Sequence, residues 1–163
     1  MTWNIGLIGL KGHQGVITNG IGLVPGARLA AVCDDDEGKL AGVPNYPGAD
    51  PNTRVFTDPL RMLDEVELDI VGVCGHDGER AATIIECARR GLHIIAEKPL
   101  AMTLEELAQV REAVQQASVH LTMLLTMRFE PAYLTMQRMV AEGAIGEVCL
   151  ANMQKSYRLG DRP

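Results

Sequence analysis

Short apolar runs recur along the chain and are separated by more polar segments. The runs cover residues 3–8, 28–33, 70–74, 93–96 and 119–126. Several are almost continuously apolar, which is typical of strands buried on both faces of a parallel sheet. The pattern therefore predicts five main strands.

Segments with helical spacing lie between most of these runs, at residues 78–90, 103–117 and 131–142. Thr103 and Glu106 form a capping-box pattern at the start of one predicted helix, and Gly91 follows the end of another. The alternation of strand and helix predicts an α/β fold with a Rossmann-type doubly wound parallel sheet. Residues 40–58 contain several prolines and predict an irregular loop, with at most a short strand at 55–57.

The C-terminal part of the sequence predicts the start of a second domain. We expect a Rossmann domain over residues 1–126, followed over 127–163 by a linker helix and the first strand of an incomplete, truncated α/β domain. That strand is predicted at 147–155. A lone strand would present an unshielded edge, so we expect self-association and a homo-oligomer.

Composition narrows the choice of partners. The 163 residues carry 15 Lys and Arg against 21 Asp and Glu, a net charge of −6, which argues against binding to nucleic acid or anionic membranes. No apolar stretch approaches the ~20 residues needed to span a bilayer, and no basic leader precedes the first strand. We expect a cytoplasmic protein with reduced thiols and no metal site, because its four cysteines are widely spaced: Cys33, Cys74, Cys87 and Cys149.

A glycine-rich turn follows the first predicted strand. Its sequence, Gly9-Leu-Lys-Gly-His-Gln-Gly15, sits where a Rossmann fold lays a pyrophosphate on a helix N-terminus. The spacing has one residue more than the usual Gly-x-Gly-x-x-Gly, and a tight turn without a ligand is the alternative. The candidate cofactor contacts in this turn are Gly9, Lys11, Gly12, His13, Gln14 and Gly15.

An acidic cluster ends the second predicted strand, about 20 residues beyond the glycine turn. A carboxylate at this point can accept hydrogen bonds from both hydroxyls of an adenosine ribose. Asp34 is the first candidate and Asp35 the second. Because a carboxylate also repels a 2′-phosphate, NAD is favoured over NADP. A solvated acidic turn is the alternative.

Charged residues also follow the strand at 93–96, at the end where open α/β sheets bind ligands. Lys98 can hydrogen-bond a substrate hydroxyl and stabilise the alkoxide formed as hydride leaves, and Glu97 can orient the lysine. Pro99 fixes the turn, for which a cis bond is one option. A surface ion pair beside a turn proline is the alternative.

The run from Gly91 to Ala101, with Glu97-Lys98-Pro99 at its centre, resembles the Gfo/Idh/MocA family of oxidoreductases. The resemblance extends to residues 69–74, 128–131 and 142–148. It implies a NAD(P)-dependent oxidoreductase that transfers a hydride to or from a sugar, inositol or related polyol. It also implies that Glu97 and Lys98 lie at the nicotinamide and substrate end. The other cofactor contacts that it implies are Cys74, Gly75, His76, Pro99 and Arg128.

Two departures from the family pattern stand out. The usual Thr-Pro-Asn-x-x-His after the fourth strand is replaced by residues 75–80, Gly-His-Asp-Gly-Glu-Arg. The chain also ends before the Asp and His that the family's second domain supplies, so we expect it to be incomplete for catalysis. Two other functions fit the residues: a non-catalytic nucleotide-binding module, and an imine reductase resembling dihydrodipicolinate reductase.

Overall fold

The fold is described from a computed structural model that places residues 2–154 and 156. The chain divides into two compact units, Met1–Leu124 and Leu125–Pro163. That the second unit begins a further domain stays a prediction.

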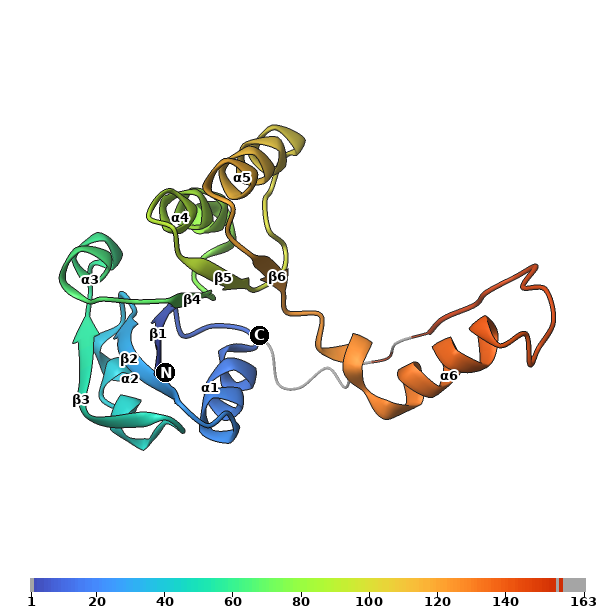
Figure 1. Cartoon of the computed structure of the whole chain (residues 1–163), viewed down its shortest axis with the longest axis horizontal. Coiled ribbons are helices and arrows are strands. Elements are labelled where there is room, and N and C mark those ends of the chain that lie inside the picture. Colours follow the sequence, from blue (N-terminus) through green and yellow to red (C-terminus); the bar gives the residue numbers. More distant parts are fainter. Residues whose placement is uncertain (1, 155, 157–163) are drawn as a thin grey trace. The chain divides into compact units, whose positions relative to one another are not determined.

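A six-stranded, all-parallel sheet forms the centre of the first unit (Figure 1). Its strand order, β3-β2-β1-β4-β5-β6, is that of a Rossmann fold, so the predicted α/β class is confirmed. The strand order reverses between β1 and β4, and ligands of such sheets bind at that point, beyond the carboxyl ends of the strands. The strands are β1 (Trp3–Ile8), β2 (Ala27–Cys33), β3 (Ala49–Phe56), β4 (Ile70–Val73), β5 (His93–Ala96) and β6 (Leu121–Met123).

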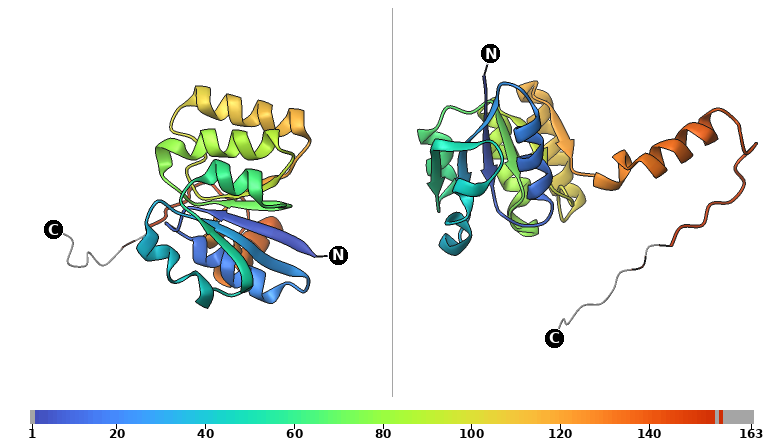
Figure 2. Two further views of the ribbon diagram at one scale, coloured as in Figure 1. Left: turned by 90° about the vertical axis from the view of Figure 1, so that its left-hand side faces the viewer. Right: turned by 90° about the horizontal axis from the view of Figure 1, so that it is seen from below.

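Helices cover both faces of this sheet (Figure 2). On one face pack α3 (Pro59–Glu65), α4 (Asp77–Arg89) and α5 (Leu104–Ala117). On the other pack α1 (Gln14–Leu23), α2 (Glu37–Leu40) and a 3-10 turn, η1 (Val43–Asn45). Two apolar clusters therefore form the core, one on each side of the sheet.

The residues predicted to begin and end two of the helices do so in the structure. The Thr103 hydroxyl accepts a bond from the Glu106 backbone N–H at 3.1 Å, and the Glu106 carboxylate accepts one from the Thr103 N–H at 3.1 Å. This confirms the capping box. Gly91 follows α4 with a φ of 75°, which confirms that a residue tolerant of positive φ ends that helix.

The sequence missed one strand and extended another. Residues 49–56, predicted to be mostly loop, form β3, which pairs with β2 at the edge of the sheet. Pro51 is tolerated there because an edge strand has one side without a ladder to complete. β6 spans only three residues, Leu121–Met123, where the apolar run predicted eight.

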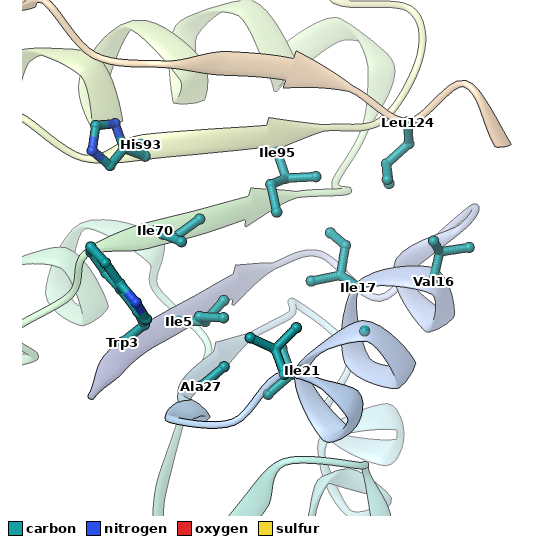
Figure 3. A pocket seen from close by; sticks show the side chains of 12 residues that line it. Trp3, Ile5, Val16, Ile17, Ile21, Ala27, Ile70, His93, Ile95 and Leu124 are labelled. Carbon is teal, nitrogen blue, oxygen red and sulfur yellow. The ribbon is translucent and has the colours of Figure 1, made fainter. Parts of the chain in front are cut away.

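An apolar groove lies along the α1 side of the sheet (Figure 3). Strand side chains form its floor and α1 forms one wall. Among its lining residues are Trp3, Ile5, Ile17, Ile70, Ile95 and Leu124.

The second unit contains a 3-10 turn, η2 (Thr126–Phe129), and α6 (Pro131–Ala141), which matches the predicted helix. The strand predicted at 147–155 is wrong over the described part of that range, because 147–154 form no strand. Residue 155 lies outside the described residues. An isolated segment has no neighbour to complete a β-ladder, and self-association into a homo-oligomer stays a prediction.

Within residues 2–154 and 156, no helix is long and apolar enough to cross a membrane. The same residues contain no group of three or more His, Cys, Asp or Glu side chains that could hold a metal ion.

Candidate functional site

The glycine turn connects β1 to α1 at the carboxyl edge of the sheet. Gly9 and Gly12 have φ values of 85° and 64°, in the region that favours glycine. α1 begins at Gln14, with His13 as its N-cap residue. Despite their irregular spacing, the glycines therefore allow a strand-to-helix turn of the type that binds phosphate groups.

Close backbone packing explains the first glycine. A Cβ on Gly9 would overlap the backbone nitrogen and Cα of Gly75, which begins the turn after β4. The turns after β1 and β4 thus meet backbone to backbone. Gly15 differs, because a Cβ there would meet no protein atom within 4 Å.

Asp34, directly after β2, is buried and holds three donors. One carboxylate oxygen accepts the Leu10 backbone N–H at 2.6 Å, and the other accepts the Asp36 N–H and the Lys39 ammonium, both at 3.0 Å. Burial alone would raise the pKa of Asp34, but these hydrogen bonds and the Lys39 charge lower it below its ordinary value. Asp34 is therefore a carboxylate that ties the glycine turn to the end of β2.

Glu97, directly after β5, is also buried, with 3% of its surface exposed. Its carboxylate lies 2.9 Å from the His13 Nδ1 and accepts the His13 backbone N–H at 3.0 Å. A Cβ on Gly12 would stand only 3.1 Å from the Glu97 carboxyl carbon. The Glu97 carboxylate thus packs against Gly12 and His13 of the glycine turn, at the N-terminus of α1.

The pKa of Glu97 is set by opposing effects. Burial would raise it, but hydrogen bonds from the His13 side chain and backbone, the His13 charge and the Lys98 backbone N–H lower it. The sequence predicted that Glu97 orients the Lys98 side chain. The structure pairs the carboxylate with His13 instead, 84 positions away in the sequence.

Lys98 is exposed at the mouth of a hollow that we call the Lys98 pocket. Glu97 and Lys98 enter it from the end of β5, and the peptide bond from Lys98 to Pro99 is cis, as the sequence allowed. The rest of the lining comes from the turns after β1 and β4 and from the first turn of α4. Among those residues are Lys11, Gly12, Gly75, His76, Asp77 and Arg80.

A second hollow, the Asp35 pocket, adjoins the first, because Lys11, Gly75 and His76 line both. It also contains Asp34 and the exposed Asp35 at the end of β2. The Lys11 ammonium lies 2.7 Å from the His76 Nε2, which lies 3.4 Å from an Asp35 carboxylate oxygen. Side chains from three turns therefore meet over the switch point of the sheet.

The structure thus brings most of the predicted site residues to one edge of the first unit. Gln14 accepts the backbone N–H of Gly15 with its side-chain oxygen, at 2.7 Å. Cys74 has a buried side chain, and burial raises the pKa of its thiol to about 12, so it offers the site its backbone and no thiolate. Arg128 belongs to the second unit, in η2, and its contact with a nicotinamide stays a prediction.

One buried residue of this edge was not predicted as part of the site. Arg80 of α4 is only 2% exposed and hydrogen-bonds the turns after β4 and β5. A signal for it exists in the sequence, since Arg80 shares helical spacing with Ala81, Ile84, Cys87 and Ala88, the apolar face of α4. A charged residue on such a face requires a partner.

Comparison with known proteins identifies the family. Residues 3–125 match the family described as "Oxidoreductase family, NAD-binding Rossmann fold", which is Gfo/Idh/MocA. The chain belongs to this family. The resemblance of the Glu97-Lys98-Pro99 motif is therefore confirmed at the level of the whole domain.

Several curated relatives are inositol dehydrogenases. The chain is 38% identical over 155 residues to inositol 2-dehydrogenase 2 of Saccharopolyspora erythraea, an alignment that covers 92% of this chain and 44% of the relative. It is 29% identical over 143 residues to scyllo-inositol 2-dehydrogenase (NAD(+)) of Bacillus subtilis, covering 88% and 40%. The chain thus spans less than half the length of these relatives.

Solved structures show the same fold. Scyllo-inositol dehydrogenase from Lactobacillus casei, crystallised with NAD(H) and scyllo-inositol, superposes with a TM-score of 0.80 at 22% identity. That match covers 90% of this chain and 43% of the other. Myo-inositol 2-dehydrogenase from Lactobacillus plantarum gives a TM-score of 0.81 at 20% identity, covering 91% and 43%.

The contact between the turns after β1 and β4 makes a matched pair of glycine substitutions informative. Gly9→Ala should destabilise the chain by more than about 2 kcal/mol, because it adds a Cβ at positive φ against the Gly75 backbone. Gly15→Ala should be neutral or stabilise by up to about 1 kcal/mol, because its Cβ meets open space in a helix. Urea unfolding measures both. Equal stability of the two variants would contradict the packing described for Gly9.

Proposed function

We propose that the carboxyl edge of the first unit binds NAD, and that the whole protein uses it to oxidise or reduce a sugar-like polyol. The observation that carries this proposal is the convergence of three groups at the switch point. The glycine turn, the acidic end of β2 and Lys98 after β5 all border two adjoining pockets. Family membership and the inositol dehydrogenases among the relatives support it.

The residues fit a dinucleotide. The glycine turn leads into the N-terminus of α1, where backbone N–H groups and the helix dipole favour a pyrophosphate. The Asp35 pocket, with carboxylates at the end of β2, suits the adenosine ribose, and the Lys98 pocket suits the nicotinamide end. Lys11, which lines both pockets, supplies a cation between them.

Asp34 is the first candidate for the ribose contact, and its environment explains how it could act. Three donors hold the carboxylate in place, and a carboxylate has about four acceptor positions, so one remains for a ribose hydroxyl. Asp35 is exposed beside it and is the second candidate. Either charge disfavours a 2′-phosphate.

In the whole protein, Lys98 would bind the substrate. NAD, when bound, supplies the hydride acceptor. Lys98 is exposed in the pocket and would donate a hydrogen bond to the reacting oxygen and stabilise the negative charge that develops on it. The hydroxyl proton would pass to a base of the whole protein, a role that suits the Asp and His which the family resemblance gives to the second domain. Glu97 is a positioning residue in this scheme, because its carboxylate braces the glycine turn through His13.

The relatives support a proposal for the substrate class. Inositols and D-apiose are the substrates named for several of them, and all carry neighbouring hydroxyl groups. We infer a polyol or sugar substrate for the whole protein, with an inositol as the first compound to test.

Cofactor choice is testable on the chain itself. NAD at about 100 times its dissociation constant should raise the free energy of unfolding by about 2.7 kcal/mol, and NADP at the same concentration should raise it less. Asp34→Asn should weaken NAD binding by about 1.5–3 kcal/mol and narrow the difference from NADP, because the amide lacks the charge that the ribose contact uses. Thermal unfolding and calorimetric titration measure these changes.

Asp35→Asn is the matched control for that substitution. If only Asp35→Asn weakens NAD binding, the ribose contact moves to Asp35. A wild-type chain that binds NADP as tightly as NAD would refute the cofactor assignment.

The role of Lys98 is testable in the full-length protein. Lys98→Ala should lower kcat with an inositol substrate by about 100-fold or more, because removing one donor to the negative charge that develops on oxygen typically costs that much. The dissociation constant of NAD should change far less, since the charge acts on the reacting oxygen. Steady-state kinetics and NAD titration separate the two effects. Equal losses in NAD affinity and kcat would assign Lys98 to cofactor binding alone.

A further inference from the structure

The buried guanidinium of Arg80 joins two turns that border the Lys98 pocket. Its Nη1 donates to the Pro99 carbonyl at 2.7 Å, and its Nη2 donates to the Gly75 carbonyl at 2.8 Å. Nη2 also lies 2.8 Å from a carboxylate oxygen of Asp77. One side chain therefore fixes the distance between the ends of β4 and β5.

Only an arginine can make this bridge. The guanidinium is a planar fork that reaches two acceptors at once, whereas lysine offers a point charge on a flexible stem. Burying a cation is costly unless it is paired, and here the pair is formed with Asp77, whose own side chain is largely exposed. Among the described residues, the buried Nε–H of Arg80 has no partner.

These features favour a role beyond fold stability. An apolar residue at this position of α4 would pack against the core without burying a charge or leaving a donor unpaired. The two carbonyls that Arg80 holds belong to Gly75, which contacts the glycine turn, and Pro99, which follows Lys98. Gly75 and Pro99 are therefore next to two parts of the Lys98 pocket lining, the glycine turn and Lys98.

We propose that Arg80 is a positioning residue for the nicotinamide side of the site. By holding the turns after β4 and β5 together, it sets the width of the Lys98 pocket and the place of Lys98 within it. The Asp35 pocket does not include Arg80 in its lining. The proposal rests on the function given above, and it predicts that the two halves of the dinucleotide respond differently to loss of Arg80.

The test compares NADH, which fills both pockets in the proposed mode, with ADP, which contains only the adenosine half. Calorimetric or fluorescence titration of the chain gives both dissociation constants. Arg80→Lys should raise that of NADH about tenfold, because lysine keeps the charge but loses one of the two carbonyl bonds. That of ADP should stay within about twofold, since the Asp35 pocket shares Gly75 with the Lys98 pocket but contains neither Arg80 nor any residue of the turn after β5.

Ile84→Val provides the matched control. Ile84 is fully buried on the same helix, and its truncation should lower Tm without changing the ratio of the two dissociation constants. A merely structural Arg80 would behave like Ile84, with NADH and ADP affected alike. Such a result would overturn the proposal.

Asp77→Ala keeps the test decisive if Arg80→Lys does not fold. Removing a carboxylate near an anionic ligand should strengthen the binding of NADH by electrostatics alone. The proposal predicts the opposite effect, because Arg80 without its Asp77 partner would hold the Gly75 and Pro99 carbonyls less firmly. The dissociation constant of NADH should rise about threefold, and that of ADP should stay nearly unchanged. Tighter or unchanged NADH binding would therefore overturn the proposal.

Failure of the proposed function is distinguishable from failure of this inference. A wild-type chain that binds neither NADH nor ADP contradicts the NAD site itself. A wild-type chain that binds both, with an unchanged ratio in the Arg80 and Asp77 variants, contradicts only the role of Arg80.

Discussion

The backbone of Gly9 packs against the backbone of Gly75 with no room for a side-chain carbon, and the candidate site depends on this contact. It brings the turn after β1 against the turn after β4, at the point where the strand order reverses. The two pockets share residues from these two turns. A larger residue at Gly9 would separate the two turns and divide the site.

Three buried charges hold the turns in place around that contact. Asp34 binds the glycine turn to the end of β2, Glu97 binds it to the end of β5, and Arg80 joins the ends of β4 and β5. Each is paired, as buried charges must be. These pairings arrange the carboxyl edge of the sheet without a ligand, which would lower the entropic cost of the proposed NAD binding.

Local patterns in the sequence were enough to predict the framework of this fold. Strands β1 and β5 follow directly from apolar runs, and the capping box at Thr103 follows from side-chain chemistry. β3 was missed because Pro51 and the turn residues beside it resemble a loop, and only the place of β3 at the sheet edge permits that proline. Residues 147–154 form no strand for the converse reason, since a local pattern cannot supply a neighbouring strand.

The residues of the candidate site were largely predictable from the sequence, but the hydrogen-bond partners of its buried charges were not. The glycine turn, Asp34 and Lys98 stand at recognisable places relative to the strands. The partners of Glu97 and Arg80 depend on tertiary contacts, and His13 lies 84 positions from Glu97. A sequence shows that a buried charge needs a partner, but the fold decides which residue provides it.

The central claim is that NAD lies across the carboxyl edge of the first unit, over the glycine turn. Backbone amide NMR of the isotope-labelled chain, titrated with NAD, tests this most directly. The account predicts shifts concentrated at residues 9–15, 34–36, 75–77 and 97–99, in the turns that line the two pockets. Shifts confined to the apolar groove beside α1, or none at millimolar NAD, would contradict it.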